Sequence, residues 1–188
     1  MADHVCYDKL EYMAHIHDKP GQYDVTSSAF IVRLDTDQPR LLLHLHKKMG
    51  KLFQPGGHVE LHETPWEAIC HEIIEETGYD IGQLEILQPK GFFIKKLAHS
   101  TVHPVSFCHS SHGFEIWPDH FHTDSAYAFV ADGGPKNKPT DGESTDLRWF
   151  TVDELKAIDS SIILEDIRTM GIDVLTTILK EWEPTPLP

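Results

Sequence analysis

The chain has 188 residues, of which 40% are hydrophobic and 24% are charged, as in chains that fold around one core. Thirty acidic and 16 basic residues give a formal charge of −14, which repels phosphates and excludes duplex nucleic acid as an expected partner. The apolar runs are far shorter than the roughly 20 residues that span a bilayer, and the N-terminus lacks the basic start and apolar run of a secretory signal. We therefore expect a cytoplasmic protein with no membrane partner.

The cysteines are Cys6, Cys70 and Cys108, an odd number without a Cys-x-x-Cys pair. This spacing argues against a disulfide framework and against a thiolate zinc site. We expect all three to be reduced thiols without a chemical role.

The first third of the chain predicts a polar extension followed by a β-hairpin. Residues 1–20 form the extension, and residues 21–188 are expected to form one domain. Residues 24–34 have the β-branched and apolar content of a buried strand, and residues 40–46 form the second strand after a polar turn. Residues 47–57 are expected to be a loop that ends in Pro-Gly-Gly.

The rest of the chain mixes strands and helices. We expect a helix over residues 64–77, strands over 84–97, 101–108 and 121–131, a loop over 132–141, a strand over 147–150, and helices over 152–158 and 162–182. This order lacks the regular alternation of a Rossmann domain. It predicts an α+β sandwich in which mixed sheets are covered by helices.

The helix predicted over residues 64–77 has well-defined ends and one apolar face. Thr64 is a suitable N-cap, Glu67 completes a capping box, and Gly78 ends the helix. The apolar face recurs at spacings of three and four and consists of Trp66, Ile69, Cys70 and Ile73. That face is expected to pack on a sheet and to leave another face for charged residues.

Three carboxylates share that other face, because Glu72, Glu75 and Glu76 stand at i, i+3 and i+4. A solvated acidic surface is the ordinary interpretation of such a cluster. The macrodipole, however, disfavours negative charge near the C-terminal end of a helix, and a divalent cation would compensate it. The preceding Gly56 and Gly57 would allow backbone atoms to approach a metal or phosphate, and oxygen ligands suit Mg²⁺ or Mn²⁺.

The segment from residue 57 to residue 79 resembles the signature of the Nudix hydrolases. That signature places glycines, glutamates and bulky apolar residues at fixed spacings, matched here by Gly57, Glu63, Glu72, Ile73, Glu75, Glu76, Gly78 and Tyr79. His71 stands where the family has arginine, and Tyr79 matches the final aliphatic position loosely. Several fixed-spacing matches make a far more specific signal than a lone glycine fingerprint, and the similarity extends over about residues 24–179.

The resemblance implies the Nudix fold, an α/β/α sandwich, and Mg²⁺- or Mn²⁺-dependent hydrolysis of a diphosphate bond. The substrate would be a nucleoside diphosphate linked to another moiety, or a nucleoside triphosphate. The implied metal ligands are Glu72, Glu75, Glu76 and the carbonyl of Gly56. Supporting residues would be Gly57, Glu63 and His71, and candidates for the catalytic base are Glu72, Glu76 and the loop residue Glu143.

Other functions stay open at this point. Because histidine is charged only when protonated, His71 raises the alternative of a catalytically weak or inactive Nudix-like domain that binds a nucleotide. Isomerisation of a prenyl diphosphate is a third reading, which the hydrolase-type signature disfavours. The expected partner is a nucleotide-type small molecule, and a homodimer stays open.

The chain holds 14 histidines, and two of them stand in an alternating pattern. His120, His122 and Asp124 would share one face of a strand. They are candidates for a Zn²⁺, Fe²⁺ or Mn²⁺ site, or for a polar strand face beside a substrate cleft. In the second case His103, His120 and His122 could donate hydrogen bonds to phosphate or ribose.

Overall fold

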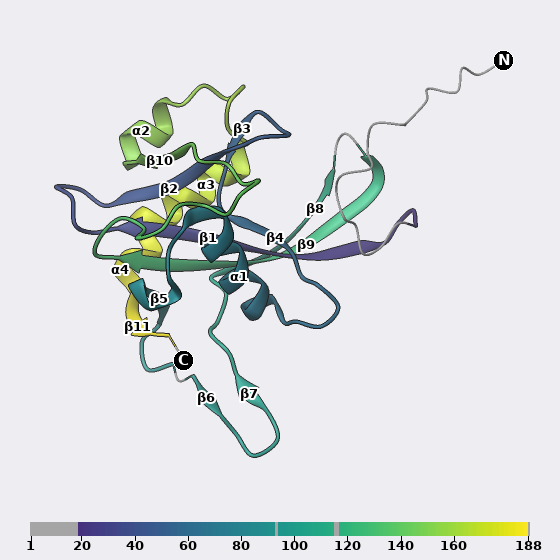
Figure 1. The fold of residues 1–188 in the computed structure, drawn as a ribbon, viewed down its shortest axis with the longest axis vertical. Coiled ribbons are helices and arrows are strands. Elements are labelled where there is room, and N and C mark those ends of the chain that lie inside the picture. Colours follow the sequence, from purple (N-terminus) through teal and green to yellow (C-terminus); the bar gives the residue numbers. More distant parts are fainter. Residues whose placement is uncertain (1–18, 93, 115–116, 188) are drawn as a thin grey trace.

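The computed structural model describes residues 19–92, 94–114 and 117–187 (Figure 1). The strands are β1 (Tyr23–Arg33), β2 (Arg40–His46), β3 (Lys51–Phe53), β4 (Gly56–His58), β5 (Leu84–Pro89), β6 (Lys95–Lys96), β7 (Thr101–Val102), β8 (Cys108–Phe114), β9 (Trp117–Ala131), β10 (Leu147–Phe150) and β11 (Trp182–Pro186). The α-helices are α1 (Pro65–Thr77), α2 (Val152–Ala157), α3 (Glu165–Asp173) and α4 (Leu179–Glu181). A 3-10 turn spans Ile81–Gln83, and a π-helical turn spans Val174–Ile178.

The main sheet is mixed, and its centre is a parallel pair. The strand order is β10-β2-β1-β9-β5-β11, with β3 on β2, β4 on β1 and β8 on β9. Strands β1 and β9 run parallel from Tyr23 opposite Phe121 to Arg33 opposite Ala131, and the other pairs in this sheet are antiparallel. Central strands of this kind are buried on both faces, which explains the apolar content of β1.

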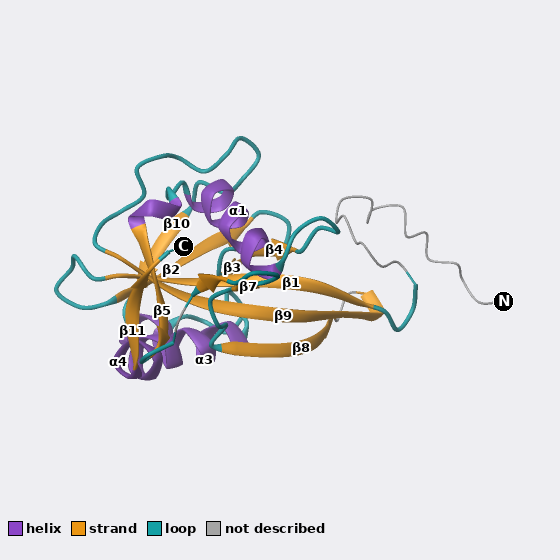
Figure 2. Ribbon diagram, turned by 90° about the horizontal axis from the view of Figure 1, so that it is seen from below, coloured by secondary structure: helices purple, strands orange, loops and turns teal. Residues whose placement is uncertain are grey.

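Helices cover both faces of this sheet, as Figure 2 shows with α1 on one side and α3 on the other. Because side chains alternate along a strand, Ile31 and Phe129 pack with the α1 residue Ile69 in one core. Phe30 and Val32 pack with Ile167 of α3 in a second core. The predicted α+β sandwich is therefore confirmed.

Several predicted elements are confirmed. Residues 40–46 and 147–150 are strands with the predicted bounds, and β1 pairs with β2 as the predicted hairpin. Helix α1 has Thr64 as its N-cap with a full capping box to Glu67. Gly78 adopts φ 75° at its C-cap, a left-handed conformation that glycine adopts without steric cost.

The prediction that residues 47–57 form a loop is wrong in part. This segment contains β3 and the start of β4, which pair with β2 and β1. Glycine and proline have low strand propensity, so the local sequence does not reveal strands that tertiary pairing stabilises. Gly56 has φ 152°, and an added Cβ there would collide with the Ser27 backbone.

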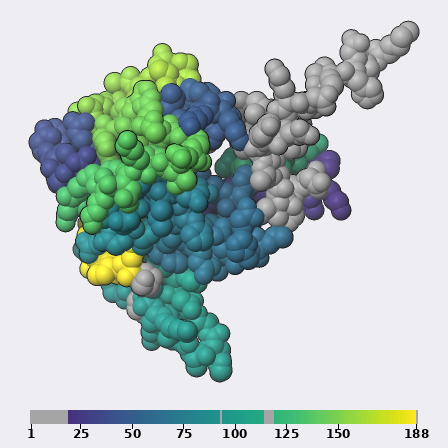
Figure 3. All heavy atoms as spheres, viewed as in Figure 1, coloured from purple at the N-terminus to yellow at the C-terminus, as the bar shows by residue number. Residues whose placement is uncertain are grey.

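The strands predicted after α1 have different bounds in the structure. The segment 84–97 divides into β5 and the short β6, and the segment 101–108 contains only β7 and the first residue of β8. Strand β8 continues through the Ser-, His- and Gly-rich residues that were expected to separate strands, because it pairs with β9. The β6–β7 hairpin projects from the body of the molecule (Figures 1 and 3).

The C-terminal helix predicted over residues 162–182 begins at Glu165 and contains the π-helical turn before α4. It is followed by β11, an unpredicted edge strand that pairs with β5 despite Pro184 and Pro186. Edge positions tolerate proline because one side of the strand forms no ladder. Residues 1–18 of the predicted extension, which include Cys6, lie outside the part of the chain that the structure describes. In the part that it describes, no helix is long and apolar enough to cross a bilayer.

Candidate active site

An open acidic cavity of about 420 Å³ lies between α1, β4 and the segment that connects them. It is lined by Lys48, Gly56, Gly57, His58, Glu60, His62, Glu63, His71, Glu72, Glu75 and Glu76. Six of the residues predicted from the signature for metal binding or support thus line one cavity, together with the predicted His71. Helical spacing brings the three helix glutamates to this side, and the pairing of β4 with β1 brings the glycines to them.

The two glycines contact the helix carboxylates directly. The backbone N–H of Gly56 donates to Oε2 of Glu76 at 2.8 Å. A Cβ at Gly57 would collide with the Glu72 carboxylate. Glycine at these two positions therefore allows the backbone of β4 to lie against the acidic face of α1.

Burial and mutual repulsion raise the pKa of two of these carboxyl groups. The pKa of Glu72 rises to about 7, mainly through burial and then through the charges of Glu75, Glu143 and Glu63. The pKa of Glu76 rises to about 8 through burial, against the opposing hydrogen bond from Gly56. Charge at these two positions is costly, so a cation that binds there would be stabilised by both carboxylates.

The sequence analysis missed His44, which lies beside Glu76 in the protein interior. Its Nε2 is 3.9 Å from Oε2 of Glu76, and His44 is 2% exposed. Burial lowers the pKa of His44 to about 4, while burial raises that of Glu76, so both groups are neutral at pH 7 and form no ion pair. The local sequence marks His44 only as a histidine between the leucines of β2, which does not reveal its contact with Glu76.

The loop between β9 and β10 closes the C-terminal end of α1. Its Thr140 N–H donates to the Glu75 carbonyl at 2.7 Å, and its Asn137 N–H donates to the Gly78 carbonyl at 3.0 Å. These bonds satisfy carbonyls at and beyond the end of the helix. They also hold Glu143 near the cavity, where its charge raises the pKa of both Glu72 and Glu76.

His71 contacts a different carboxylate from those expected from helical spacing. Its Nδ1 lies 2.9 Å from Oε2 of Glu63, whereas Glu67 and Glu75 are its neighbours at i±4. The Glu63 side chain is 8% exposed, and its Oε1 accepts the N–H of Glu60 at 3.0 Å. His71 therefore orients Glu63, and its charge also acts on Glu72.

The donor set of the cavity fits Mg²⁺ or Mn²⁺, because clustered carboxylates and backbone carbonyls are the ligands that these hard cations prefer. The raised pKa values of Glu72 and Glu76 arise mainly from burial and then from neighbouring carboxylates, and a bound cation would offset both effects. The predicted ligand role of the Gly56 carbonyl stays a prediction.

The predicted grouping of His120, His122 and Asp124 divides into two sets in the structure. Asp124 accepts hydrogen bonds from Thr26 at 2.8 Å and from Ser28 at 3.0 Å. These bonds turn Asp124 toward β1, although burial keeps its pKa raised. His103 lies instead near Glu67 at the start of α1, where the two interact electrostatically.

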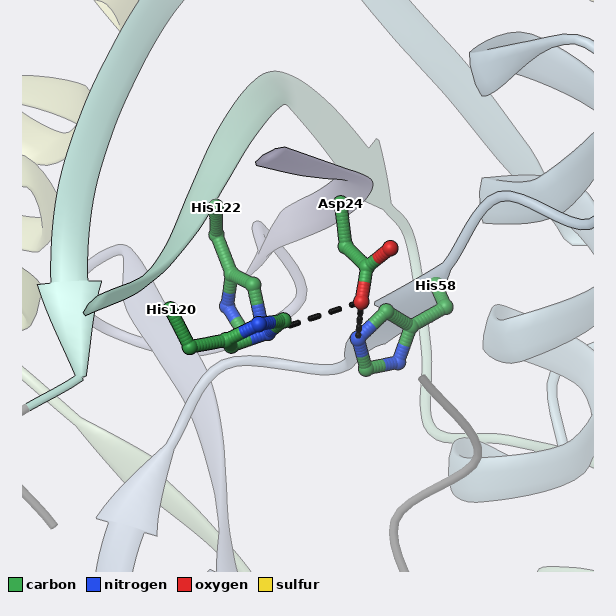
Figure 4. A group of neighbouring side chains, drawn as sticks. All are labelled: Asp24, His58, His120 and His122. Carbon is green, nitrogen blue, oxygen red and sulfur yellow. Dashed lines mark hydrogen bonds and ion pairs between the residues drawn. The ribbon is translucent and has the colours of Figure 1, made fainter. Parts of the chain in front are cut away.

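His120 and His122 converge with two residues that sequence reasoning did not identify, Asp24 and His58 (Figure 4). Burial and the neighbouring histidines lower the pKa of His122 to about 3, so this imidazole is neutral at physiological pH. Strand pairing explains the group, since Asp24 is opposite His122 and His58 is opposite Thr26. No local pattern links these positions.

Comparison with known proteins agrees with the fold. Residues 25–166 match the family model described as NUDIX domain. A relative from Caenorhabditis elegans, named "Putative nudix hydrolase 1", is 26% identical over 152 residues, which cover 79% of this chain and 33% of that protein. The chain thus spans about a third of the length of the curated relative that it matches.

Solved structures give the same result. A NUDIX-family hydrolase from Clostridium perfringens is 30% identical with a TM-score of 0.66, over 82% of this chain and 97% of that one. A NUDIX hydrolase from Nitrosomonas europaea has a TM-score of 0.54 at 20% identity, over 87% and 93% of the two chains, and supports the fold alone. The chain belongs to the NUDIX domain family.

Proposed function

We propose that this protein is a metal-dependent pyrophosphohydrolase. It would cleave a diphosphate bond in a nucleoside diphosphate linked to another moiety, or in a nucleoside triphosphate, with Mg²⁺ or Mn²⁺ as cofactor. Residues 21–188 would form the single domain that carries this activity.

The observation that carries the proposal is the convergence of three helix glutamates on one open cavity behind a glycine pair. Glu72 and Glu76 are largely withdrawn from water, and the pKa of each carboxyl group is raised to near or above neutrality. Groups with pKa values shifted toward neutrality cluster at catalytic sites. Family membership favours the same interpretation.

In this mechanism the cation would be held by Glu72, Glu75, Glu76 and the Gly56 carbonyl. A divalent cation held there would neutralise charge that develops on phosphoryl oxygens and would activate a water molecule. Lys48 lies on the cavity wall and would supply a positive charge for a substrate phosphate.

The remaining carboxylates are candidates for the proton acceptor. A general base works best when its pKa is near the working pH, and the pKa of Glu72 is about 7. Glu143 is half-buried on the loop that closes α1, and we propose it as an alternative acceptor because its charge acts on both Glu72 and Glu76. Glu76 is the third candidate, although its hydrogen bond from Gly56 favours a positioning role.

A turnover screen tests the proposal. The substrates are nucleotide sugars, ADP-ribose, dinucleoside polyphosphates, nucleoside and deoxynucleoside triphosphates, and capped RNA, each with Mg²⁺ and with Mn²⁺. Substitution of Glu72, Glu76 or Glu143 by glutamine then identifies the base, because loss of the base lowers turnover and removes the acidic limb of the pH–rate profile while metal affinity is retained, whereas loss of a ligand lowers metal affinity.

Glu85→Gln is the matched control, since Glu85 is exposed on β5 and does not line the cavity. Metal-dependent turnover that Glu85→Gln retains and Glu76→Gln loses supports the hydrolase. Tight nucleotide binding without turnover on any of these substrates would instead establish the alternative, a NUDIX domain that binds nucleotides.

A further inference from the structure

A second group of metal-ligating side chains lies apart from the three helix glutamates. Asp24 of β1, His58 of β4, and His120 and His122 of β9 each direct one ligand atom to a common point, and these four atoms lie within 4.8 Å of one another (Figure 4). The group lies at the start of β1, and its four side chains come from three neighbouring strands.

This group lies on the other face of the sheet from α1. Asp24, Phe30 and Val32 are an even number of residues apart along β1, so their side chains point to the same face of the sheet. Phe30 and Val32 pack in the core that includes α3. The β1–β9 ladder runs without interruption, with His122 opposite Asp24, so both belong to that face. Only His58, which follows Gly57, also borders the acidic cavity.

Three of the separations between the ligand atoms are close to those around one tetrahedral ion, and all of them are within 4.8 Å. With metal–ligand bonds of 2.0–2.1 Å, the ligand atoms of a tetrahedral Zn²⁺ site are about 3.3–3.4 Å apart. Nε2 of His120 lies 3.1 Å from Nε2 of His122 and 3.4 Å from Oδ2 of Asp24. Nε2 of His58 lies 3.7 Å from that same carboxylate oxygen. Side-chain rotations that shorten the wider separations to this distance would place an ion between the four atoms.

A cation fits the contacts of Nε2 of His120 better than one proton does. Nε2 of His120 faces both an imidazole nitrogen and a carboxylate oxygen, and a neutral ring has at most one proton on that atom. One proton cannot be directed well at both neighbours, whereas a cation would accept the lone pairs of all of them. Burial favours the same interpretation, because Asp24 is 0% exposed and His120 and His122 are 5% and 6% exposed. A bound cation would stabilise a carboxylate that is withdrawn from water.

We propose that Asp24, His58, His120 and His122 form a four-ligand site for a divalent transition metal, with Zn²⁺ as the ion that fits best. Three imidazole nitrogens and one carboxylate oxygen suit Zn²⁺, whereas Mg²⁺ prefers six oxygen ligands. Four protein ligands leave no open position, which is characteristic of a structural site. The ion would join β1, β4 and β9 and so hold the strand that carries Gly56 and Gly57.

Metal retention by the untagged full-length protein tests this site. The protein is stripped with EDTA, desalted, supplied with Zn²⁺ in excess Mg²⁺, dialysed, and measured by elemental analysis. We expect about one Zn²⁺ per chain in the wild type and in Glu76→Gln. His122→Ala and Asp24→Asn should bind Zn²⁺ at least about 100-fold more weakly, since even outer-shell partners of a metal contribute 10–100-fold. His99→Ala, which removes an exposed imidazole, should bind as the wild type does.

Cobalt substitution keeps the test decisive if a variant does not fold. The wild-type protein should give the intense visible absorption of four-coordinate Co²⁺, and Zn²⁺ should displace it. The site is refuted if the wild type retains no Zn²⁺ and shows no such absorption. Zn²⁺ retained equally by a folded His122→Ala protein, or lost from Glu76→Gln alone, also overturns it. These outcomes do not depend on hydrolysis, so failure of the proposed activity would leave the result intact.

Discussion

The substitution Glu76→Gln should stabilise the metal-free protein at high pH while it abolishes most catalysis. Glutamine removes the charge but retains an oxygen that can accept the Gly56 N–H, which lies 2.8 Å from the carboxylate. The Glu76 side chain is 10% exposed, so solvent screens its charge little. The variant therefore isolates the electrostatic cost of this carboxylate.

The size of the effect follows from the pKa of Glu76, which rises from 4.5 to about 8 on folding. Because the folded state holds the proton more tightly, stability falls as pH rises from 4.5 to about 8. At about 1.36 kcal/mol per pKa unit, the ionised group costs up to about 5 kcal/mol above that window. For a chain of this size each kcal/mol corresponds to roughly 2–4 °C in Tm.

The assay is thermal unfolding followed by circular dichroism in EDTA at pH 4.5, 6, 7.5 and 9, alongside Glu85→Gln. Glu76→Gln should unfold at the wild-type temperature at pH 4.5 and up to about 10–20 °C higher at pH 9. Mg²⁺ should raise the Tm of the wild type more than that of the variant, and turnover should fall by about 100-fold or more. A difference in Tm that does not change with pH would refute the electrostatic reasoning, and wild-type turnover would refute the ligand role.

Three further substitutions test the neighbourhood of the cavity. Gly57→Ala should lower turnover at least about 10-fold, with a smaller loss of stability, because its Cβ displaces the Glu72 carboxylate; kinetics and unfolding of the same sample separate the two effects. His71→Arg should raise metal affinity or turnover at alkaline pH and change little near pH 6, since arginine stays charged; identical pH profiles would leave His71 no electrostatic role. Thr64→Ala should destabilise the protein by about 1 kcal/mol through loss of the N-cap, measured by urea unfolding, and a loss below about 0.3 kcal/mol would contradict the capping argument.

Local sequence determined helix α1 and its acidic face almost completely. The capping box, the left-handed Gly78 and the glutamate spacing depend on contacts between residues at most four apart, so periodicity and capping rules suffice. The same rules predicted β2 and β10 with their observed bounds. The signature around Glu72 and Glu76 consequently located the acidic cavity before any tertiary contact was known.

Local rules failed where strands depend on distant partners. Strand β4 contains two glycines and forms through pairing with β1, and β8 extends through polar residues because β9 lies beside it. The contact between His71 and Glu63 likewise joins residues eight positions apart, because Glu63 lies in the segment that precedes α1. A short stretch of sequence predicts neither the strands β4 and β8 nor the contact between His71 and Glu63.

Only the tertiary structure decided which side chains share the two sites. His44 reaches Glu76 because it lies on the same face of β2 as Leu42, which packs against α1. Glu143 lies near Glu76 because its loop donates hydrogen bonds to carbonyls at the end of α1. Asp24 meets His122 across a parallel ladder that joins residues nearly one hundred positions apart, while Asp124 bonds to Thr26 instead. Pairing of this kind is chosen by packing over the whole sheet, so the sequence supplies the ligands and the register determines which of them meet.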